Sequence, residues 1–533
     1  MRPARPVTLL AIATAIGHLL VNALTPYGVH RDELLYLAMG THLAYWRMDF
    51  PPMIAVLANV QRAVGGDSLV SIRFLPACAA GALVWLAGYS ARRLGGGAGA
   101  QLLAAIAVVA SPLFLRTGTL FQPVIFDQLW WTLALVLLVR IGDASVAGVA
   151  GVARAADDAG GARAPDADGT ARAARREWLL VGVVMGLGLL TKFSIAFIGL
   201  AIAAALLATP MRRSLRTPWP WVAVLLTFVI GSASLVGQLR LGWPVRGQMD
   251  ELRSSQLVHV GMLDFVVQQF LFGPQTLLAA LGAWWLLRDP AARRWRAAGA
   301  SAVFAFLLLL VLRGKAYYIG PIYPLLYGAG AMALARFADA RAGAARRVAL
   351  PAAAVACLLY GAVLLPVGVP VLPPARMERY VAALGLTQAV RNNQRGIERL
   401  PQDYGDMLPW KAQAEAVARV FHALAPEDRA RAVVGAANYG EAGALDLYGP
   451  ALGLPPVVSG AGSFWFFGPG VQPGEVAVVL GGTAADLRQL FDSVEVAALV
   501  REPFAVGEEQ EVPVLVARKP KVPLQVAWPA LRP

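Results

Sequence analysis

Apolar runs long enough to cross a lipid bilayer recur along the first two-thirds of this chain. The first covers residues 7 to about 24, and a helix needs about 20 such residues to cross the hydrocarbon core. Of the 533 residues, 57% are hydrophobic and only 15% are charged. Helices satisfy their own backbone hydrogen bonds, so they are the structure that such runs form in lipid. The pattern predicts a polytopic α-helical membrane protein rather than a soluble enzyme.

Arginines between the apolar runs indicate the topology. They cluster in short loops, which stay in the cytoplasm when they are basic, and this explains the formal net charge of +14 better than nucleic acid binding does. Eleven spans are predicted: 7–24, 69–90, 100–115, one ending at 140, two within 178–208, and 219–238, 265–287, 298–312, 319–336 and 348–367. With a cytoplasmic N-terminus, this odd number places the C-terminal part outside the membrane.

Two segments in the middle of the chain depart from a simple series of spans. Residues 143–176 are rich in Ala, Gly, Asp and Arg and have no apolar periodicity, which is typical of a flexible linker, here cytoplasmic. Residues 178–208 are apolar but have arginines on both sides. They must therefore cross and return as two short helices, with a turn at 191–194.

The C-terminal part, residues 368–533, is less hydrophobic than the preceding domain of residues 1–367. A helix-like segment at 411–424 precedes strand-like runs at 432–436, 456–458 and 476–480, and a helical pattern follows at 484–491. Alternating strands and helices predict a small α/β domain, on the extracytoplasmic side. The diglycine after the third run, at 481–482, is a weak phosphate-loop signal, and a plain turn explains it better.

The loop after the first run carries charge where charge is costly. His30, Arg31, Asp32 and Glu33 stand in sequence just where the helix leaves the membrane, and ionisable groups near hydrocarbon indicate a functional site. Neighbouring helical residues project about 100° apart, so the two carboxylates cannot both face one atom. We predict that Asp32 does chemistry and that Glu33 assists it; a helix-capping pair is the structural alternative.

Further charged and aromatic residues are expected on or near the outer side. A single cation there has an ordinary explanation, since long basic side chains extend to the interface; Asp127 could simply begin a helix, and the tyrosines could be interface aromatics. Their convergence beside carboxylates instead predicts a site for an anionic headgroup such as a phosphate. The candidate substrate-binding residues are Arg31, Asp49, Arg73, Arg116, Asp127, Lys192, Lys315, Tyr317 and Tyr318.

Five short motifs occur in an order that resembles glycosyltransferase family 39, of glycosyltransferase-C architecture. This group includes the protein O-mannosyltransferases and the lipid A aminoarabinose transferases. The tail motifs at 438–443 and 462–465 resemble the C-terminal domain of a bacterial subgroup. The five ordered motifs are His30–Tyr36, Asp49–Pro52, Phe126–Asp127, Gly188–Lys192 and Gly314–Pro324.

The resemblance implies a polyprenyl-phosphate sugar donor, an acceptor hydroxyl on a lipid, glycan or protein, and transfer on the outer face of the membrane. It also implies that a carboxylate of the first outer loop is the base, and Asp32 matches it best. The family often has a histidine where this chain has Phe50, so Asp49 becomes the more interesting neighbour. Direct displacement of the phosphate would invert the anomeric carbon.

Other interpretations stay open. A transporter of lipid-linked sugars or anionic lipids would also bind an anion between helices, although no internal repeat is evident. A non-catalytic envelope assembly protein would leave Asp32 and the outer lysines without a role. No cofactor is assigned; a divalent metal bound by His30, His42 and carboxylates stays open, although their spacing has no metal signature.

Overall fold

The chain forms two compact units that are interleaved in sequence. The computed structural model describes residues 2–157, 167–341, 344–391 and 396–532. Unit 1 comprises residues 1–20, 73–236 and 248–369, and unit 2 comprises residues 21–72, 237–247 and 370–533. The predicted division into domains at residues 367 and 368 stays a prediction.

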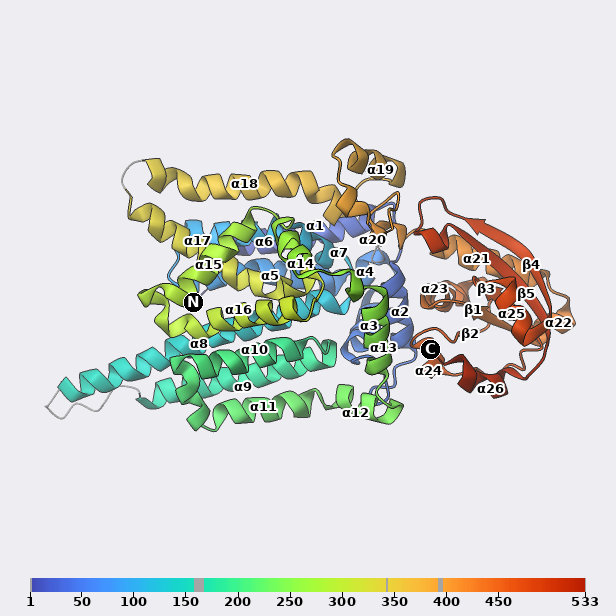
Figure 1. Ribbon diagram of the computed structural model, residues 1–533, viewed down its shortest axis with the longest axis horizontal. Helices are drawn as coiled ribbons and strands as arrows, with labels where there is room; N and C mark the ends of the chain where they lie inside the picture. The colour runs from blue at the N-terminus through green and yellow to red at the C-terminus, as the bar shows by residue number, and fades with distance from the viewer. Residues whose placement is uncertain (1, 158–166, 342–343, 392–395, 533) are drawn as a thin grey trace. The chain divides into compact units, whose positions relative to one another are not determined.

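Unit 1 consists of helices, and its long helices lie side by side (Figure 1). Helix α1 (Arg5–Leu24) begins in it, and α12 (Ser232–Leu241) and α13 (Pro244–Ser255) have residues in both units. Its other elements are α5 (Phe74–Arg93), α6 (Ala98–Val109), α7 (Pro112–Thr119), α8 (Pro123–Asp157), α9 (Ala167–Thr191), α10 (Ile195–Ala208), η1 (Pro210–Arg216), α11 (Trp219–Ile230), η2 (Leu257–His259), α14 (Met262–Phe270), α15 (Gln275–Arg288), η3 (Pro290–Trp295), α16 (Arg296–Val311), η4 (Ala316–Ile322), α17 (Tyr323–Asp339) and α18 (Ala344–Gly368).

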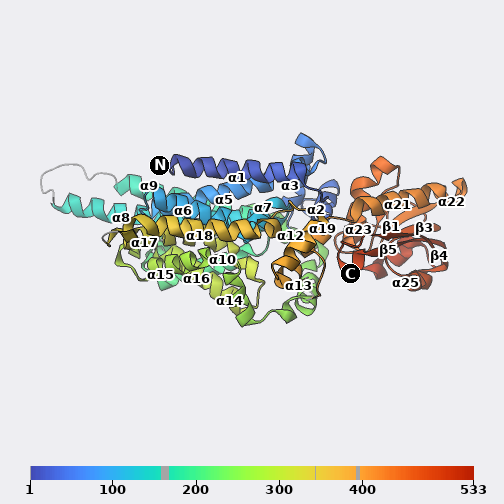
Figure 2. The same ribbon diagram turned by 90° about the horizontal axis from the view of Figure 1, so that it is seen from above.

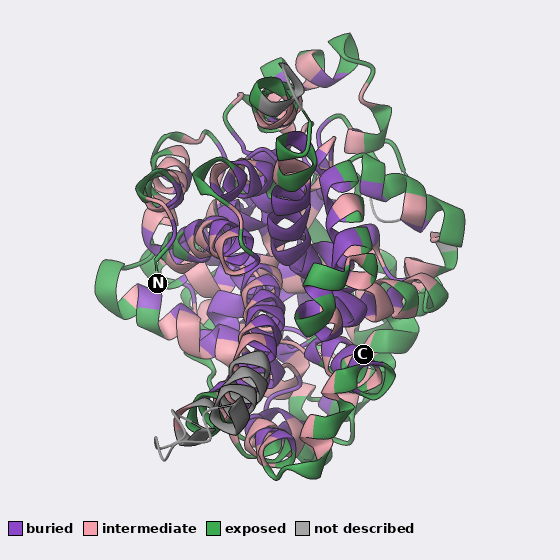
Figure 3. Ribbon diagram, turned by 90° about the vertical axis from the view of Figure 1, so that its left-hand side faces the viewer, coloured by how far each residue is buried: buried purple, intermediate pink, exposed green. Residues whose placement is uncertain are grey.

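These helices support the predicted membrane class. Among the described residues, five helical segments are long and apolar enough to cross a membrane, and up to nine are if each of four bent helix pairs is one span. The most apolar windows of α5 and α8 are 67% and 72% buried, whereas that of α18 is 11% buried. Helices α5 and α8 are therefore central in unit 1, and Figure 3 shows buried residues gathered among the inner helices. The predicted count of eleven spans stays a prediction.

Helices α15 and α17 cross very closely because each has a glycine that faces the backbone of the other helix. A Cβ built on Gly282 would lie 2.1 Å from the carbonyl oxygen of Leu326, and one on Gly330 would lie 1.9 Å from that of Leu278. Small residues at such crossings let backbones approach, which is how helices associate where no hydrophobic drive exists between them.

The predicted turn in residues 178–208 is confirmed, but the linker before it differs from the prediction. Helix α9 ends at Thr191 and α10 begins at Ile195. Helix α8 continues to Asp157 and α9 begins at Ala167, so both ends of the segment 143–176 are helical. Alanine and arginine have a high helix propensity, so this segment forms helix although it has no apolar periodicity. Residues 158–166 of this segment lie outside the described residues.

Unit 2 contains a five-stranded mixed sheet in the order β2-β1-β3-β5-β4. Strands β1 and β3 are parallel and β1 pairs β2 in parallel, while β5 is antiparallel to both β3 and β4. The strands are β1 (Ala432–Ala436), β2 (Val457–Val458), β3 (Val476–Leu480), β4 (Phe491–Arg501) and β5 (Glu511–Pro520). The first three confirm the strand-like runs of the sequence.

Helices cover both faces of this sheet. Figure 2 shows α21 and α25 on opposite faces. One face presents Val433, Ala477 and Ala517, which pack against Leu487 of α25. The helices of unit 2 are α2 (Arg31–Thr41), α3 (Met53–Gly65), α4 (Leu69–Ile72), α19 (Pro374–Ala383), η5 (Thr387–Val390), α20 (Gln402–Gly405), α21 (Trp410–Ala423), α22 (Pro426–Ala430), α23 (Tyr439–Tyr448), η6 (Pro450–Leu452), α24 (Phe464–Phe467), α25 (Ala484–Leu490), η7 (Gly507–Glu509), α26 (Leu524–Ala527) and η8 (Trp528–Leu531). The α/β prediction for the C-terminal part is confirmed.

Candidate active site

The acidic pair of the opening loop lies at the beginning of α2, and its two members have different surroundings. His30 is the N-cap, and its Nδ1 accepts a hydrogen bond from the Asp32 backbone N–H at 3.1 Å. The Glu33 carboxylate is fully buried and accepts from the backbone N–H of His30 at 2.8 Å. This reciprocal pair is a capping box, which satisfies amides that the first helical turn leaves unpaired. Glu33 thus stabilises the helix start that carries Asp32.

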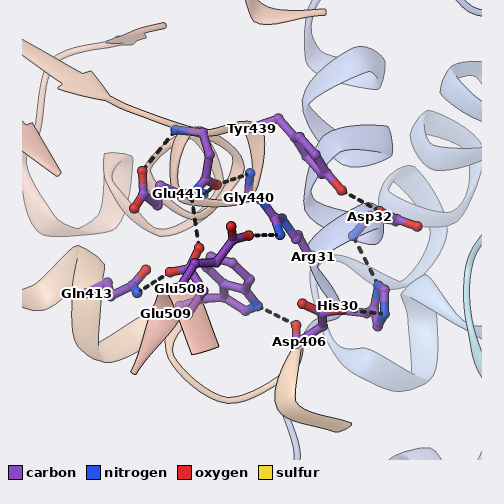
Figure 4. Close-up of polar contacts among 12 residues, drawn as sticks. His30, Arg31, Asp32, Asp406, Gln413, Tyr439, Gly440, Glu441, Glu508 and Glu509 are labelled. Carbon is purple, nitrogen blue, oxygen red and sulfur yellow. Dashed lines mark hydrogen bonds and ion pairs between the residues drawn. The ribbon is translucent and has the colours of Figure 1, made fainter. Parts of the chain in front are cut away.

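Asp32 is half-buried and is contacted by a residue from the C-terminal part of the chain (Figure 4). The Tyr439 hydroxyl donates a hydrogen bond to Asp32 Oδ1 at 3.0 Å. The guanidinium carbon of Arg31 lies 4.6 Å from the centroid of the Tyr439 ring, and the same guanidinium forms an ion pair with Glu508. Asp32 therefore sits in a polar cluster that α2, α23 and η7 build together.

Several carboxyl groups lie close to this cluster. His30 Nε2 lies 3.7 Å from Asp403 Oδ1 and 3.9 Å from Asp406 Oδ2. Burial raises the pKa of Asp406 to about 7, with the positive charges of His30 and Arg31 acting against it. The pKa of a buried carboxyl rises because burial disfavours its charged form. Near neutral pH, Asp406 is thus poised between its two protonation states.

Two further buried carboxyl groups, those of Glu441 and Glu509, lie near Arg31. Glu441 accepts hydrogen bonds from the backbone N–H groups of Ala437 and Asn438, both at 3.0 Å, in the capping box of α23. Burial, followed by the charge of Glu509, raises the pKa of Glu441 to about 8. Burial also raises the pKa of Glu509, which accepts a hydrogen bond from Gln413 at 2.8 Å. Folding thus favours the protonated form of both groups.

These raised pKa values predict that the protein loses stability as the pH rises. A carboxyl whose pKa is higher in the folded state stabilises it below the unfolded pKa, and this contribution is lost as the pH passes the folded value. Asp406 and Glu441 therefore act in the same direction, and the loss runs from about pH 4, where the unfolded groups ionise, to about pH 8. We expect the melting temperature of the detergent-solubilised protein to fall over this range, and Glu441→Gln, which keeps the acceptor oxygen but cannot ionise, to make the fall shallower. An equally steep fall in Glu441→Gln would contradict this origin.

Asp49 is buried in unit 2 and ties its own loop to two other segments. Its Oδ2 accepts a hydrogen bond from the Ser463 hydroxyl at 2.7 Å, and its backbone oxygen accepts from Gln238 Nε2 at 2.5 Å. A Cβ built on Gly237 would lie 2.5 Å from the backbone oxygen of Met48, so this approach requires glycine. These contacts give Asp49 a structural task, and its predicted contact with substrate stays a prediction.

Unit 1 brings three of the predicted motifs together around the turn between α9 and α10. The buried Asp127 Oδ2 accepts a hydrogen bond from the Ser194 hydroxyl at 2.7 Å. Lys192 Nζ lies 4.9 Å from the centroid of the Tyr318 ring, within the range of a cation–π contact. Trp130 of α8 donates to Thr191 Oγ1 at 2.9 Å and so holds the turn against α8. Residues far apart in sequence thus meet beside one lysine.

The other predicted site residues of unit 1 differ in exposure. Lys315 is half-buried at the N-cap of η4 and bonds to Gln256 Oε1. Tyr317 packs edge-on against Tyr318, with ring centroids 4.7 Å apart. Arg73 is fully buried immediately before α5, and Arg116 is exposed near the end of α7. The explanation that a basic side chain extends to the membrane interface therefore does not apply to Arg73.

The structure thus assembles the predicted site residues as two groups, one in each unit. Arg31, Asp32 and Glu33 belong to unit 2, as does Asp49; Arg73, Arg116, Asp127, Lys192, Lys315, Tyr317 and Tyr318 belong to unit 1. Convergence of both groups in one site stays a prediction. Within the described ranges, no group of three or more His, Cys, Asp and Glu residues is arranged to hold a metal ion.

Sequence reasoning missed Tyr439, Asp406 and Glu508. A signal for Tyr439 was present, because α23 begins with a capping sequence followed by glycines at 440 and 443. That spacing puts two small residues on one helix face and predicts close packing. Its partner could not be read from the pattern, since 407 positions separate Tyr439 from Asp32.

Comparisons with known proteins cover three of the five predicted motifs in a family model and nearly the whole chain in a fold. Residues 49–147 and 169–236 match the family model of dolichyl-phosphate-mannose-protein mannosyltransferases. No curated protein matches the sequence. The crystal structure of ArnT from Cupriavidus metallidurans in the apo state is 18% identical and has a TM-score of 0.57, covering 95% of this chain and 97% of that chain. The structure of the same protein bound to undecaprenyl phosphate has 16% sequence identity and a TM-score of 0.57, and the match covers 96% of this chain and 98% of that chain. At this identity the likeness shows a shared fold. The predicted resemblance to glycosyltransferase family 39, of glycosyltransferase-C architecture, is therefore confirmed, and the fold is similar to that of ArnT.

Proposed function

We propose that this protein is a membrane glycosyltransferase that moves a sugar from a polyprenyl-phosphate donor to an acceptor hydroxyl. The reaction takes place on the outer face of a bacterial cytoplasmic membrane and inverts the anomeric carbon. Asp32 is the general base, and Lys192 and Lys315 bind the donor phosphate. The acceptor is a lipid, a glycan or a protein.

The observation that carries this proposal is the arrangement around Asp32. A carboxylate at a helix start, with an arginine beside it and a tyrosine hydroxyl bonded to it, has a fixed position. A general base needs a fixed position because it must reach the hydroxyl proton in the transition state. The motif of residues 30–36 that contains Asp32 is the first of the ordered motifs by which the sequence resembles the family.

The fold and the lysines support the donor class. ArnT, which shares the fold over nearly the whole chain, has been crystallised with undecaprenyl phosphate. In unit 1 of this chain, Lys192 stands beside the Tyr318 ring and its charge acts on Asp127. A lysine so placed supports binding of a phosphate as a point charge.

The chemistry needs few protein groups because the donor already has a good leaving group. Asp32 removes the proton from the acceptor hydroxyl as its oxygen attacks the anomeric carbon. The bond from that carbon to the phosphate oxygen breaks, and the departing phosphate is stabilised by the lysine charges. A single displacement of this kind requires no second carboxylate to protonate the leaving group, unlike glycoside hydrolysis.

Mass analysis of the cell envelope tests the proposal directly. Envelope lipids, glycans and proteins from cells without the protein should lack a modification that corresponds to one sugar, and the wild-type gene should restore it. A gene encoding Asp32→Asn should not restore it, although the variant protein is inserted at the wild-type level. Restoration by Asp32→Asn would favour a transporter or an assembly protein instead.

A further inference from the structure

Helices α2 and α23 meet at their N-terminal ends, although they come from opposite ends of the chain. Each begins with a capping box, His30 with Glu33 and Asn438 with Glu441. Both helix starts are thereby fixed before any contact between them is considered, because a capping box satisfies the first amides of a helix.

Two glycines of α23 set the distance between these helices. A Cβ built on Gly440 would lie 2.7 Å from Cγ of Arg31, and one built on Gly443 would lie 2.7 Å from Cβ and 2.9 Å from the backbone carbon of Leu34. Such distances leave no room for a side chain, and Leu34 is fully buried. The face of α23 that carries these glycines is thus pressed onto α2, and little sliding is possible between the two.

The close approach lines up a chain of polar contacts that ends on Asp32 (Figure 4). Glu508 pairs with Arg31, the Arg31 guanidinium covers the Tyr439 ring, and the Tyr439 hydroxyl donates to Asp32 Oδ1. Desolvation, followed by the charge of Asp32, raises the pKa of Tyr439 well above its ordinary value. The hydroxyl therefore keeps its proton and acts as a donor throughout the physiological range.

We propose that Tyr439 is a positioning residue for the base, so that the C-terminal α/β part completes the active site rather than being an appended module. This inference rests on the proposed function of Asp32. By donating to one oxygen, the hydroxyl fixes the orientation of the carboxylate, as a general base requires. The other charged groups that act on this cluster are His30, Arg31, Asp403, Asp406, Glu508 and Glu509.

Tyr439→Phe tests the inference because it removes the hydroxyl and keeps the ring under Arg31. We expect kcat with a polyprenyl-phosphate sugar to fall on the order of 10- to 100-fold, the loss associated with a hydrogen bond to a charged group. The KM for the donor should not change. This split between kcat and KM is what a loss of positioning predicts, whereas a general structural defect would also lower the melting temperature.

Tyr448→Phe, at the other end of α23, is the matched control, since it removes one tyrosine hydroxyl from the same helix, and it should leave kcat unchanged. In an Asp32→Asn background, Tyr439→Phe should have no further effect on the residual rate, since it acts through Asp32. If Tyr439→Phe does not fold, Glu508→Gln, which removes the charge that holds the Arg31 guanidinium over the ring, should also lower kcat without changing the KM for the donor. A wild-type rate in Tyr439→Phe, with Asp32→Asn inactive, would overturn the inference alone. Full activity of Asp32→Asn would overturn the proposed function itself.

Discussion

Replacing Asp32 with asparagine is expected to abolish sugar transfer while leaving the protein folded and inserted. Asparagine has nearly the same shape and still offers an oxygen to the Tyr439 hydroxyl, so the contact seen at 3.0 Å can persist. It cannot accept the acceptor's proton at neutral pH. Loss of a general base lowers the rate on the order of 10²- to 10⁴-fold. Turnover of a polyprenyl-phosphate sugar by purified protein measures this directly.

Glu33→Gln is the matched control for that variant. Its carbonyl oxygen can still accept from the His30 backbone N–H, so the capping box survives in part. We expect a much smaller loss of turnover than in Asp32→Asn. A loss in Glu33→Gln as great as that in Asp32→Asn would contradict the assisting role of Glu33.

Alanine at Lys192 or Lys315 should weaken donor binding far more than it changes thermal stability. Each variant removes one positive charge from the proposed phosphate site, and a charge-assisted contact contributes about 10- to 100-fold in affinity. Both lysines are half-buried and not part of a tight core, so the melting temperature should change little. Titration of the purified variants with polyprenyl phosphate gives the dissociation constants.

Arginine at position 192 should restore affinity in part, because it keeps the charge and the contact with the Tyr318 ring but not the compact ammonium. Lys411→Ala, an exposed lysine on α21, controls for the loss of one charge and should bind the donor normally. Wild-type affinity in both alanine variants would show that these lysines have an interfacial rather than a binding role.

Local patterns predicted much of this fold. Strands β1 and β3 lie at the predicted residues because each is a short apolar run bounded by turn residues, and α21 follows an amphipathic period. Strands β4 and β5 were not predicted. Most residues of β4 are at least partly exposed and charged residues are mixed among them, so no buried run marks it.

The candidate site was predictable only in part, for a physical reason. Charge in an apolar context is visible in the sequence and led to Asp32, Lys192 and Lys315. The contacts that define Asp32 depend on tertiary packing between α2 and α23. A pattern confined to neighbouring residues does not specify which helix a distant tyrosine will contact. The high helix propensity of alanine and arginine likewise extends α8 and α9 into the segment for which the composition predicted a flexible linker.

The interleaved composition of unit 2 has a consequence for biosynthesis. Asp32 leaves the ribosome early, whereas its partner Tyr439 follows 407 residues later. At about 5–20 residues per second, this delay is roughly 20–80 s. Throughout that interval a nascent chain can insert its helices while the base lacks its tyrosine. A prematurely terminated chain that reaches the membrane would therefore contain every predicted lysine and carboxylate and still lack the tyrosine that holds the base.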